Sequence, residues 1–410
     1  MENHIKTNGT QQFIKKNNSL NNNILNKKIQ NFINVNLKSN LTKLILKGSP
    51  FEEVSIQEIA DQILAKNSCK KKLPTWFDAE NIYYPNKLNI EQTSSEITAK
   101  YKSDLVSGAT LIDITGGFGV DAFFFSQIVK NITHCEISED LSAIVSHNFK
   151  QLKAKNIKTH FGDGIEFLEK SKEKFDWIYA DPSRRNDAKE KVFLLKYCLP
   201  NIPENLDLLF QKTDHILLKI SPILDISSAI NELKYVKEIH VVAIENEVKE
   251  LLFLLQKNYT QNIDIKTINF NKEENQSFNF SLNKEVYATF SEPKKYLFEP
   301  NSAILKAGAF RQISAYLKID KLHQHSHLYT SNKLIDFPGR KFEIKHCISY
   351  DKKQLLKLIP TKKANITTRN FPETVAQIRK KTGLKDGGNQ YLFFTTDMNN
   401  KLMALICEKA

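Results

Sequence analysis

The pattern of hydrophobic and polar residues changes along the chain and divides it into regions. Polar residues, mainly Asn, Lys and Gln, dominate 1–23, and we expect this segment to be disordered because it can bury little apolar surface. In 24–106 apolar residues recur at helical spacing, most clearly from Ile56 to Leu64, which predicts a helical N-terminal domain. From residue 107 onward, apolar residues form short runs between turn residues, which is typical of buried strands that alternate with helices.

Four of these apolar runs lead into an acidic residue. The acids are Asp113, Glu136, Asp163 and Asp181. Strands that alternate with helices form a parallel sheet, and doubly wound sheets bind their ligands at the carboxyl ends of the strands. We therefore expect these four carboxylates to line one crevice.

A glycine-rich turn, Thr115-Gly116-Gly117-Phe118-Gly119, follows the first run. Glycines let the backbone take positive φ and let a ligand come close to it. The spacing differs from the dinucleotide pattern G-x-G-x-x-G, and no Lys-Ser/Thr pair follows as in a P-loop. An acid before the turn favours a ligand with an amino group or hydroxyls over one with phosphates. Glu136 lies 23 residues after Asp113, about the spacing expected of a ribose-binding acid.

Together, the four runs, the turn and the acids resemble the class I S-adenosylmethionine-dependent methyltransferases. The resemblance implies an α/β, Rossmann-like domain over 107–270 and S-adenosyl-L-methionine as the cofactor. It implies that Asp113, Gly117 and Gly119 line the methionine end of the cofactor, that Glu136 accepts from the ribose hydroxyls, and that Asp163 meets the adenine amine. The other candidate cofactor-binding residues are Thr115, Gly116, Gly164, Gln92, Ser95 and Lys102. An alternative for the last three is that they belong to a capped helix and nothing more.

The residues after the fourth run, Asp181-Pro182-Ser183-Arg184-Arg185, are the candidate catalytic residues. Amine-methylating enzymes of this class have Asp/Asn-Pro-Pro-Tyr/Phe here, in which the acid and a prolyl carbonyl bind the exocyclic amine and the aromatic ring stacks on the base. Asp181 and Pro182 retain the amine-binding half, whereas Ser183 and Arg184 replace the stacking half. An arginine can stack on a base or bind a phosphate, or it can form an ion pair with a neighbouring acid. No Cys follows Pro182, which argues against 5-methylcytosine chemistry.

The composition is that of a globular protein with an excess of positive charge. Hydrophobic residues make up 41% of the chain, charged residues 26%, and the net charge is +13. This charge favours nucleic acid as a partner, although a general bias toward Lys, Asn and Ile is an alternative explanation. The five cysteines include no C-x-x-C pair, and no apolar run approaches the ~20 residues that span a bilayer. We expect a cytoplasmic protein without disulfides or a membrane partner.

Past the strand expected at 238–244, the pattern is harder to interpret. Alternating charges at 245–250 predict the start of an amphipathic helix. Residues 271–335 contain short alternating segments that predict strands, with a turn at 296–301 and a helix at 303–317.

Three histidines, His323, His325 and His327, lie two residues apart. On a strand they would share one face, which is typical of a metal site. No Cys or carboxylate lies among them, so we expect no bound metal.

The C-terminal segment, 336–410, predicts a separate small α/β unit. Its basic residues include Lys362, Lys363, Arg369 and the run 379–381. A small α/β module with one basic side is a common RNA-binding device. Alternatively, the run at 379–381 only complements the dipole of the helix that it ends.

The whole chain beyond the first ~20 residues resembles a bacterial family of methyltransferases that carry a ferredoxin-like segment and a C-terminal THUMP-like domain. The motifs behind this resemblance are Asp113-x-Thr115-Gly116-Gly117-Phe118-Gly119-x-Asp121, Asp181-Pro182-Ser183-Arg184-Arg185, Phe298-Glu299-Pro300-Asn301, Ser326-His327-Leu328-Tyr329-Thr330 and Phe337-Pro338-Gly339-Arg340. The resemblance implies a helical domain at 24–106, the methyltransferase at 107–270, a ferredoxin-like domain at 271–335 and a THUMP-like, RNA-binding domain at 336–410. The glycine-rich motif is also similar to that of a bacterial rRNA guanine-N2 methyltransferase family.

We therefore expect an S-adenosylmethionine-dependent methyltransferase that acts on an exocyclic base amine, guanine N2 or adenine N6, in tRNA or rRNA. Two alternatives stay open. The acceptor is a protein or a small molecule, or the chain is an RNA-binding protein whose methyltransferase fold is not catalytic. Retained acids at the strand ends argue against the second, because a site without chemistry has no need of unpaired carboxylates. The sequence does not set the oligomeric state.

Overall fold

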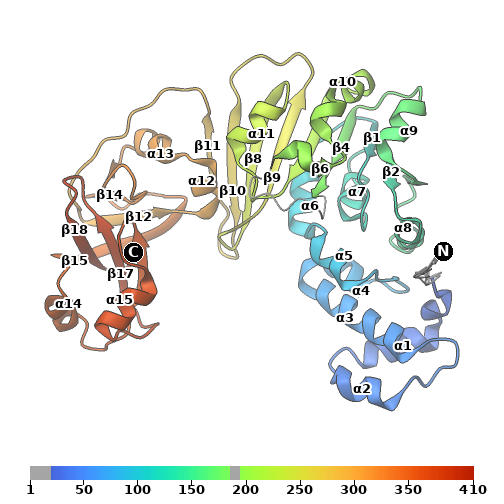
Figure 1. Cartoon of the computed structure of the whole chain (residues 1–410), viewed down its shortest axis with the longest axis horizontal. Coiled ribbons are helices and arrows are strands. Elements are labelled where there is room, and N and C mark those ends of the chain that lie inside the picture. Colours follow the sequence, from blue (N-terminus) through green and yellow to red (C-terminus); the bar gives the residue numbers. More distant parts are fainter. Residues whose placement is uncertain (1–19, 185–193) are drawn as a thin grey trace, which may run out of the picture. The chain divides into compact units, whose positions relative to one another are not determined.

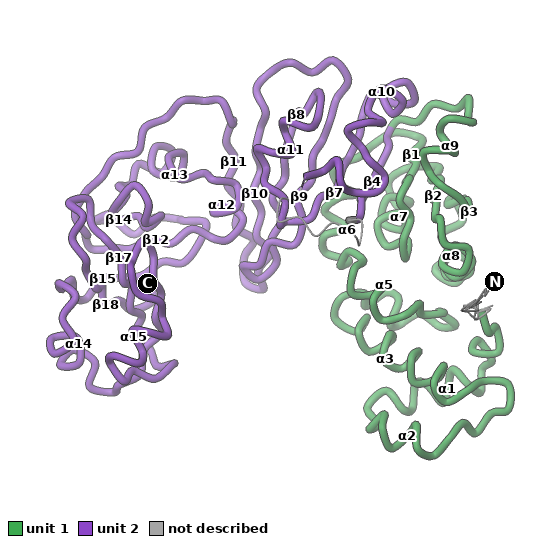
Figure 2. Tube along the Cα trace, viewed as in Figure 1, with its two compact units in different colours: residues 1–176 green, residues 177–410 purple. Residues whose placement is uncertain are grey.

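The chain divides into two units, residues 1–176 and 177–410 (Figure 2). The structure is a computed structural model that describes residues 20–184 and 194–410. Unit 1 contains the helical segment and the first α/β elements, and unit 2 contains the remaining strands and helices (Figure 1).

Unit 1 begins with a helical segment, as the apolar spacing predicts. Its elements are η1 (Asn22–Leu25), α1 (Lys27–Val35), α2 (Leu41–Lys47), α3 (Ile56–Lys72), α4 (Pro74–Asp78), α5 (Lys87–Gln92) and α6 (Glu96–Ser103). Helix α3 starts with a capping box, in which the Glu58 N–H donates to Ser55 Oγ and the Ser55 N–H donates to the Glu58 carboxylate. The apolar faces of α1, α2 and α3 meet in one core, which includes Ile33 and Ile63.

The second part of unit 1 alternates strands and helices. Its elements are β1 (Thr110–Asp113), α7 (Val120–Phe125), β2 (Asn131–Glu136), α8 (Glu139–Gln151), β3 (Ile157–Phe161) and α9 (Gly164–Lys170). Strand β1 pairs in parallel with β2, and β2 pairs in parallel with β3. Asp113 and Glu136 are the last residues of β1 and β2, and Asp163 lies two residues after β3. Three of the predicted acids therefore follow neighbouring parallel strands at the same edge of this sheet.

Within unit 1, the helical segment is joined to α8 by one buried side chain. Asn148 is 1% exposed. Its amide oxygen accepts from the Tyr83 N–H and its amide nitrogen donates to the Tyr83 carbonyl, both at 2.9 Å. Trp76 adds an edge-to-face contact with Phe123 of α7, with ring centroids 5.0 Å apart. The helical segment is thus held against the same layer that carries the glycine-rich turn.

Unit 2 opens with the strands that continue the α/β pattern. In its described part they form a mixed arrangement in the order β11-β10-β8-β9-β7-β4. The elements are β4 (Trp177–Ala180), β5 (Ser183–Arg184), η2 (Leu195–Tyr197), β6 (Cys198–Leu199), α10 (Ile202–Lys212), β7 (His215–Ile220), α11 (Ile226–Glu232), β8 (Val236–Ile244), β9 (Glu247–Gln256), β10 (Asp264–Phe270) and β11 (Gln276–Ser281). Strands β4 and β7 are parallel, whereas β9 is antiparallel to both of its neighbours.

The prediction of a helix that begins at 245–250 is wrong. Glu245 and Asn246 have φ values of 49° and 63° and form a two-residue hairpin turn between β8 and β9. Positive φ at both central residues matches the twist of the flanking strands. The chain then runs as β9, in which 250–255 are buried, so the apolar run is a central strand.

The second sheet of unit 2 has the order β13-β14-β12-β15-β18-β17-β16. Its strands are β12 (Tyr296–Pro300), β13 (Asp320–Lys321), β14 (Tyr329–Ser331), β15 (Gly339–Ser349), β16 (Asn365–Arg369), β17 (Tyr391–Thr396) and β18 (Leu402–Lys409). The helices are α12 (Ser302–Ala307), α13 (Phe310–Leu317), α14 (Lys352–Leu358) and α15 (Val375–Thr382). Side chains from β15, β17 and β18 share a core with α14 and α15.

Two predictions in this region are wrong. Residues 296–300 are strand β12 rather than a turn, because they pair with both β14 and β15 and are mostly buried. The single helix expected at 303–317 is two helices, since Gly308 has a φ of 69° and ends α12 in the left-handed conformation.

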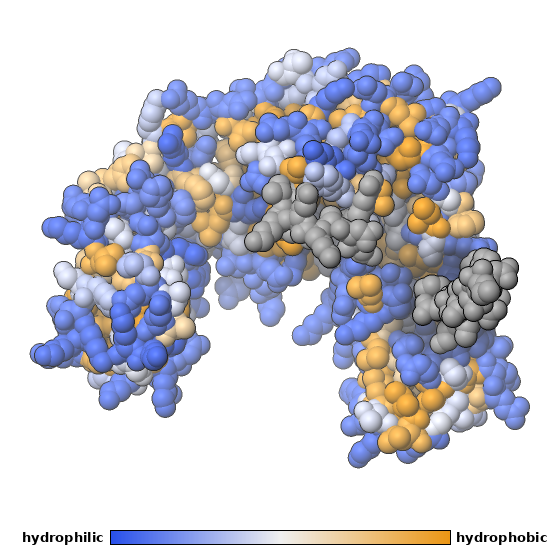
Figure 3. Space-filling view, in the orientation of Figure 1, coloured by the Kyte–Doolittle hydropathy of each residue, from blue (hydrophilic) through white to orange (hydrophobic). Residues whose placement is uncertain are grey.

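The surface view in Figure 3 shows apolar side chains gathered over α1 and α2 of the helical segment. Val35 and Leu46 lie in these helices and are both 82% exposed. Among the described residues, no helix is long and apolar enough to cross a membrane.

Candidate active site

The glycine-rich turn after β1 combines two packing glycines with one that faces open space. Gly116, Gly117 and Gly119 have φ values of 47°, 69° and 76°. A Cβ on Gly116 would lie 2.4 Å from the Cys135 carbonyl oxygen, and one on Gly119 would lie 2.6 Å from the Phe149 ring. A Cβ on Gly117 would meet no atom within 4 Å. The first two glycines allow the turn to pack, and Gly117 leaves its backbone open to a ligand.

Asp113 presents a buried carboxylate with one unsatisfied oxygen. It is 1% exposed, and Oδ1 accepts from the Thr115 N–H, the Thr115 hydroxyl and the Gly116 N–H at 3.0–3.1 Å. Oδ2 is buried and has no hydrogen-bonding partner among the described residues. Burial raises the pKa of Asp113 to about 8, while the hydrogen bond from the Thr115 N–H opposes this rise and the nearby Asp121 adds to it.

Glu136 connects the end of β2 to the glycine-rich turn. One carboxylate oxygen accepts from the Gly117 N–H and the other from the Ser138 N–H, both at 2.7 Å. The residue is 6% exposed, and burial raises its pKa. Each oxygen has a second lone pair, so the carboxylate can also accept from hydroxyl groups.

Asp163 caps helix α9. Its Oδ1 accepts from the Ile165 N–H at 2.7 Å and from the Glu166 N–H at 3.1 Å. The next residue, Gly164, must lack a side chain, because a Cβ there would lie 2.4 Å from the Ile114 carbonyl oxygen. Gly164 therefore lets α9 start directly beside the end of β1.

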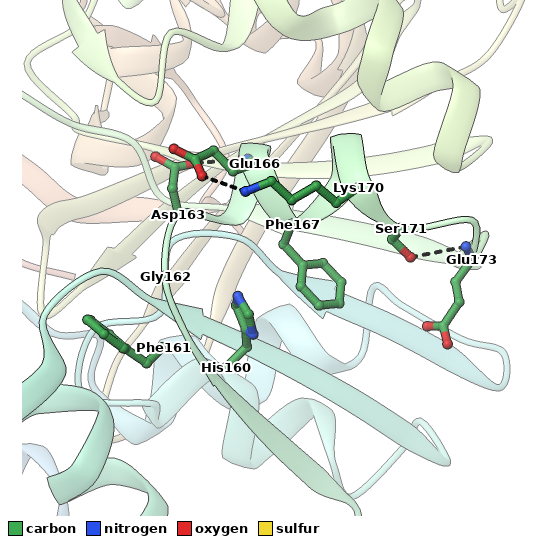
Figure 4. A pocket seen from close by; sticks show the side chains of 9 residues that line it. All are labelled: His160, Phe161, Gly162, Asp163, Glu166, Phe167, Lys170, Ser171 and Glu173. Atoms are coloured by element: carbon green, nitrogen blue, oxygen red, sulfur yellow. Dashed lines mark hydrogen bonds and ion pairs between the residues drawn. The ribbon is translucent and has the colours of Figure 1, made fainter.

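A cavity of about 510 Å³ lies beside Asp163 (Figure 4). Its lining residues are His160, Phe161, Gly162, Asp163, Glu166, Phe167, Lys170, Ser171 and Glu173. His160 and Phe167 point toward each other in it, and their ring centroids are 4.8 Å apart. Neither Asp113 nor Glu136 lines the cavity, so it is not by itself a site for a ligand that contacts all three acids.

Two exposed apolar side chains near the strand ends were not predicted from the sequence. Ile137 directly follows Glu136 and is 71% exposed, and Phe161 is paired with Glu136 in the sheet and is 55% exposed. Such side chains can cover the faces of a flat ring. The signal that would have found them is an apolar residue at the end of a strand, next to an acid that faces a ligand.

The three candidates before β1, Gln92, Ser95 and Lys102, have different positions. Gln92 is the exposed last residue of α5. Ser95 is the N-cap of α6, where its hydroxyl accepts from the Thr98 N–H at 3.3 Å. Lys102 of the same helix is fully buried and lies 3.2 Å from an Asp121 carboxylate oxygen and 3.1 Å from Ser94 Oγ. Lys102 thus holds Asp121 of the glycine-rich motif, and the sequence offered no sign of this pairing.

In unit 2, Asp181 directly follows β4 and forms an ion pair that was not predicted. Lys219 Nζ of β7 lies 2.5 Å from Asp181 Oδ2. The side chain of Asp181 is 38% exposed and that of Lys219 is 12% exposed. Pro182 is buried, and Ser183 is exposed and pairs with Leu199 in the β5–β6 ladder.

The two predicted arginines are placed only in part. The backbone of Arg184 pairs with Cys198, and its side chain is outside the described part of the structure. Arg185 lies outside the described residues. The structure therefore assigns no contact to either guanidinium.

The three histidines of the C-terminal region do not lie on a strand, so they do not share the face that a strand would give them. They follow β13 in a turn, where His323 bonds to Asn400 and Asn370, and His327 stacks on the Phe310 ring. Among the described residues, no group of three or more His, Cys, Asp or Glu side chains is arranged to hold a metal ion.

Comparison with known proteins identifies the family. A protein from Porphyromonas gingivalis W83 whose crystal structure is known, and which is assigned as a methyltransferase, has 30% sequence identity to this chain. The match covers 93% of this chain and 98% of that protein, with a TM-score of 0.85. The chain belongs to this methyltransferase family. Its class I Rossmann-like fold, its enzyme class and its cofactor, S-adenosyl-L-methionine, are as predicted.

Two family models match the C-terminal part of this methyltransferase. A ferredoxin-like domain matches residues 296–338, and a THUMP-like domain matches residues 339–409. These matches confirm the resemblance found in the sequence motifs. The full set of boundaries given above for the five regions stays a proposal.

The methyltransferase is also similar to the ribosomal RNA small subunit methyltransferase J of Bdellovibrio bacteriovorus. The two are 26% identical over 125 residues, which is 29% of this chain. The match spans about half (49%) of the length of that relative.

The residues of unit 1 fit the cofactor of the family. The unsatisfied, buried Asp113 Oδ2 suits a charged amino group, Gly117 leaves space beside the turn, and Glu136 has acceptor capacity for hydroxyls. An oxygen of this kind without a partner costs about 1–3 kcal/mol, which a bound ammonium group would recover.

Proposed function

We propose that this methyltransferase transfers a methyl group from S-adenosylmethionine to an exocyclic amine of a base in structured RNA, either tRNA or rRNA. The observation that carries the proposal is Asp181-Pro182 directly after β4, the position at which enzymes of this class bind an amine. The THUMP-like domain, the partial similarity to an rRNA methyltransferase and the net charge of +13 support RNA as the substrate.

The cofactor residues in this proposal come from unit 1. Asp113 Oδ2 accepts from the cofactor's amino group, Gly117 contacts its methionine end, and Glu136 accepts from the ribose hydroxyls. Asp163 lies near the adenine amine. Thr115, Gly116, Gly119 and Gly164 shape the surrounding turns, and Gln92 and Ser95 stay candidates for the methionine end. When bound, the cofactor supplies a methyl group that its sulfonium has already activated, so positioning provides most of the rate.

The amine residues in this proposal come from unit 2. The Asp181 carboxylate and the Pro182 carbonyl accept hydrogen bonds from the target amine and direct its lone pair. As the new N–C bond forms, the nitrogen becomes cationic and then loses a proton, for which Asp181 is the acceptor. Ser183 and the two arginines take the place of the usual stacking residues, with Arg184 or Arg185 contacting the base or the RNA backbone.

The test is transfer of tritiated methyl from S-adenosylmethionine to total tRNA and total rRNA from cells that lack the protein. We expect label in one RNA fraction. Asp181→Ala should abolish it, because the amine loses its acceptor. Asp207→Asn is the matched control: it changes an acid on the surface of α10 in the same unit, and should leave the label unchanged.

The other outcomes separate the alternatives. Cofactor binding by calorimetry with no label in RNA, but label in protein or in small molecules, would contradict the RNA assignment. Cofactor and RNA binding without label in any fraction would instead identify a non-catalytic RNA-binding protein. Digestion of labelled RNA to nucleosides then determines whether the methyl group lies on guanine N2, adenine N6 or another atom.

A further inference from the structure

Lys219 is a charged residue in a strand that is mostly apolar. It lies in β7, with the sequence His-Ile-Leu-Leu-Lys-Ile, and Leu218 and Ile220 on either side are at most 1% exposed. A lysine in such surroundings is costly unless it is paired. Because the side chain of Asp181 is 38% exposed, solvent screens the ion pair, and we expect it to contribute little to the stability of the fold.

The strand register explains why Lys219 meets Asp181. Strands β4 and β7 run in parallel, with Ala180 opposite Leu218. The next residues on the two strands are Asp181 and Lys219, and they lie at the carboxyl ends. Open α/β sheets bind ligands at these ends. The strand register therefore places the pair where a sheet of this kind binds its ligands, which suggests that the pair contacts the substrate.

We infer that Lys219 is a positioning residue for methyl transfer: its ammonium fixes the Asp181 carboxylate and, with it, presents a hydrogen-bond donor beside an acceptor. This inference rests on the function proposed above. Lys219 Nζ donates to Asp181 Oδ2, and this charge-assisted hydrogen bond restricts rotation of the carboxylate about its side chain.

The Lys219 ammonium is a donor and the Asp181 carboxylate is an acceptor. Together they match a base edge on which an amine lies next to a ring nitrogen that accepts a hydrogen bond. Guanine N2 lies next to the ring acceptor N3, and adenine N6 lies next to the ring acceptor N7. In both cases the amine N–H can face Asp181 while the ring nitrogen faces Lys219. The pair thus selects an amine that neighbours a ring nitrogen. An isolated amine or a hydroxyl can donate to Asp181 but offers no acceptor to Lys219.

The experiment measures methyl transfer to the accepting RNA fraction by the full-length protein and three variants. Lys219→Met keeps the volume of the side chain and removes its charge. We expect kcat to fall by about 10²-fold, because a misplaced acceptor group loses the near-attack geometry, with little change in KM. Lys219→Arg should recover part of the rate. Lys266→Met, which removes an ion-paired lysine from β10 of the same sheet, should have no effect.

A double-variant comparison separates positioning from a purely structural role. If Lys219 acts through Asp181, Lys219→Met should cost less rate when added to Asp181→Asn than when made alone, and the loss that remains is the contact of its ammonium with the ring nitrogen. Independent, multiplying losses would contradict the inference. Thermal unfolding and cofactor binding, measured on each variant, identify a loss of rate that comes only from misfolding.

Substrate analogues test the base edge. Accepting RNA in which the ring nitrogen beside the target amine is replaced by C–H should lose rate with the native protein and not lose further rate with Lys219→Met. Full activity of Lys219→Met would overturn the inference and leave the proposed function intact. Full activity of Asp181→Ala would overturn the proposed function itself.

Discussion

Asp113 is the last residue of β1 and carries a buried carboxylate whose Oδ2 has no hydrogen-bonding partner among the described residues. Stability alone does not favour this arrangement, since burial raises the pKa of Asp113 to about 8. A cationic group from a ligand would reverse that shift. The free-energy cost of burying this carboxylate without a full set of partners would therefore be offset when a cationic ligand binds, and perturbed groups of this kind are common at functional sites.

This predicts that cofactor binding releases a proton. Below pH 8 the free Asp113 carboxyl is protonated, and the cofactor's ammonium group favours the ionised form. We expect close to one proton released per cofactor bound at pH 6.5, and affinity that rises with pH until about 8. Calorimetry in two buffers with different ionisation enthalpies gives the proton number. An enthalpy that is the same in both buffers would exclude this role, and Asp113→Asn should remove the effect.

Gly116 and Gly117 should respond differently to Ala. Both need positive φ, which costs a residue with a side chain about 1–2 kcal/mol. Gly116→Ala also drives its Cβ into the Cys135 carbonyl, so we expect loss of fold stability. Gly117→Ala has space, so its extra effect should fall on the cofactor. Thermal unfolding and cofactor titration of both variants check this. Equal losses of stability would contradict the assignment of Gly117 to the ligand.

At the scale of elements, helix α8 carries a buried side chain, Asn148, that helps to hold the helical segment in place. Asn148→Ala leaves both the N–H and the carbonyl of Tyr83 without their partner. We expect the free energy of unfolding to fall by about 1–3 kcal/mol. Denaturant titration followed by a probe in unit 1 measures it. Lys150→Ala, an exposed change in the same helix, should stay within about 0.5 kcal/mol of the native protein.

At the scale of the whole molecule, only some of the basic side chains behind the net charge of +13 are available to bind a partner, because others form ion pairs within the protein. Arg379 pairs with Asp386 and donates to the carbonyls of Ala364 and Leu384, and Lys381 pairs with Glu373. These side chains of the predicted basic run therefore form contacts within their own domain. The side chains of three exposed lysines of the same domain, Lys362, Lys363 and Lys385, form no ion pair or hydrogen bond with the described residues. Their backbones lie side by side, and the Lys385 N–H donates to the Lys362 carbonyl.

Binding of RNA should depend on salt through these lysines. Each phosphate contact contributes about −0.7 to −0.9 to the slope of log affinity against log salt concentration. Charge reversal of Lys362, Lys363 and Lys385 to Glu should reduce both affinity and slope, as measured by filter binding. The same reversal at Lys38, Lys70 and Lys71, exposed lysines of the helical segment, is the control. A larger loss in the control would move the RNA surface to that segment.

The sequence by itself determined what short-range patterns control. Apolar runs gave the parallel strands of unit 1, Ser55 and Glu58 gave a helix start, and the glycine-rich turn gave the cofactor class. Tertiary structure decided the rest. Residues 247–256 are a strand because β7 and β8 bury them on both sides, whereas their charges alone suggest a helix. The Lys219–Asp181 pair exists only because two strands 38 residues apart lie in register, a contact that no local pattern encodes.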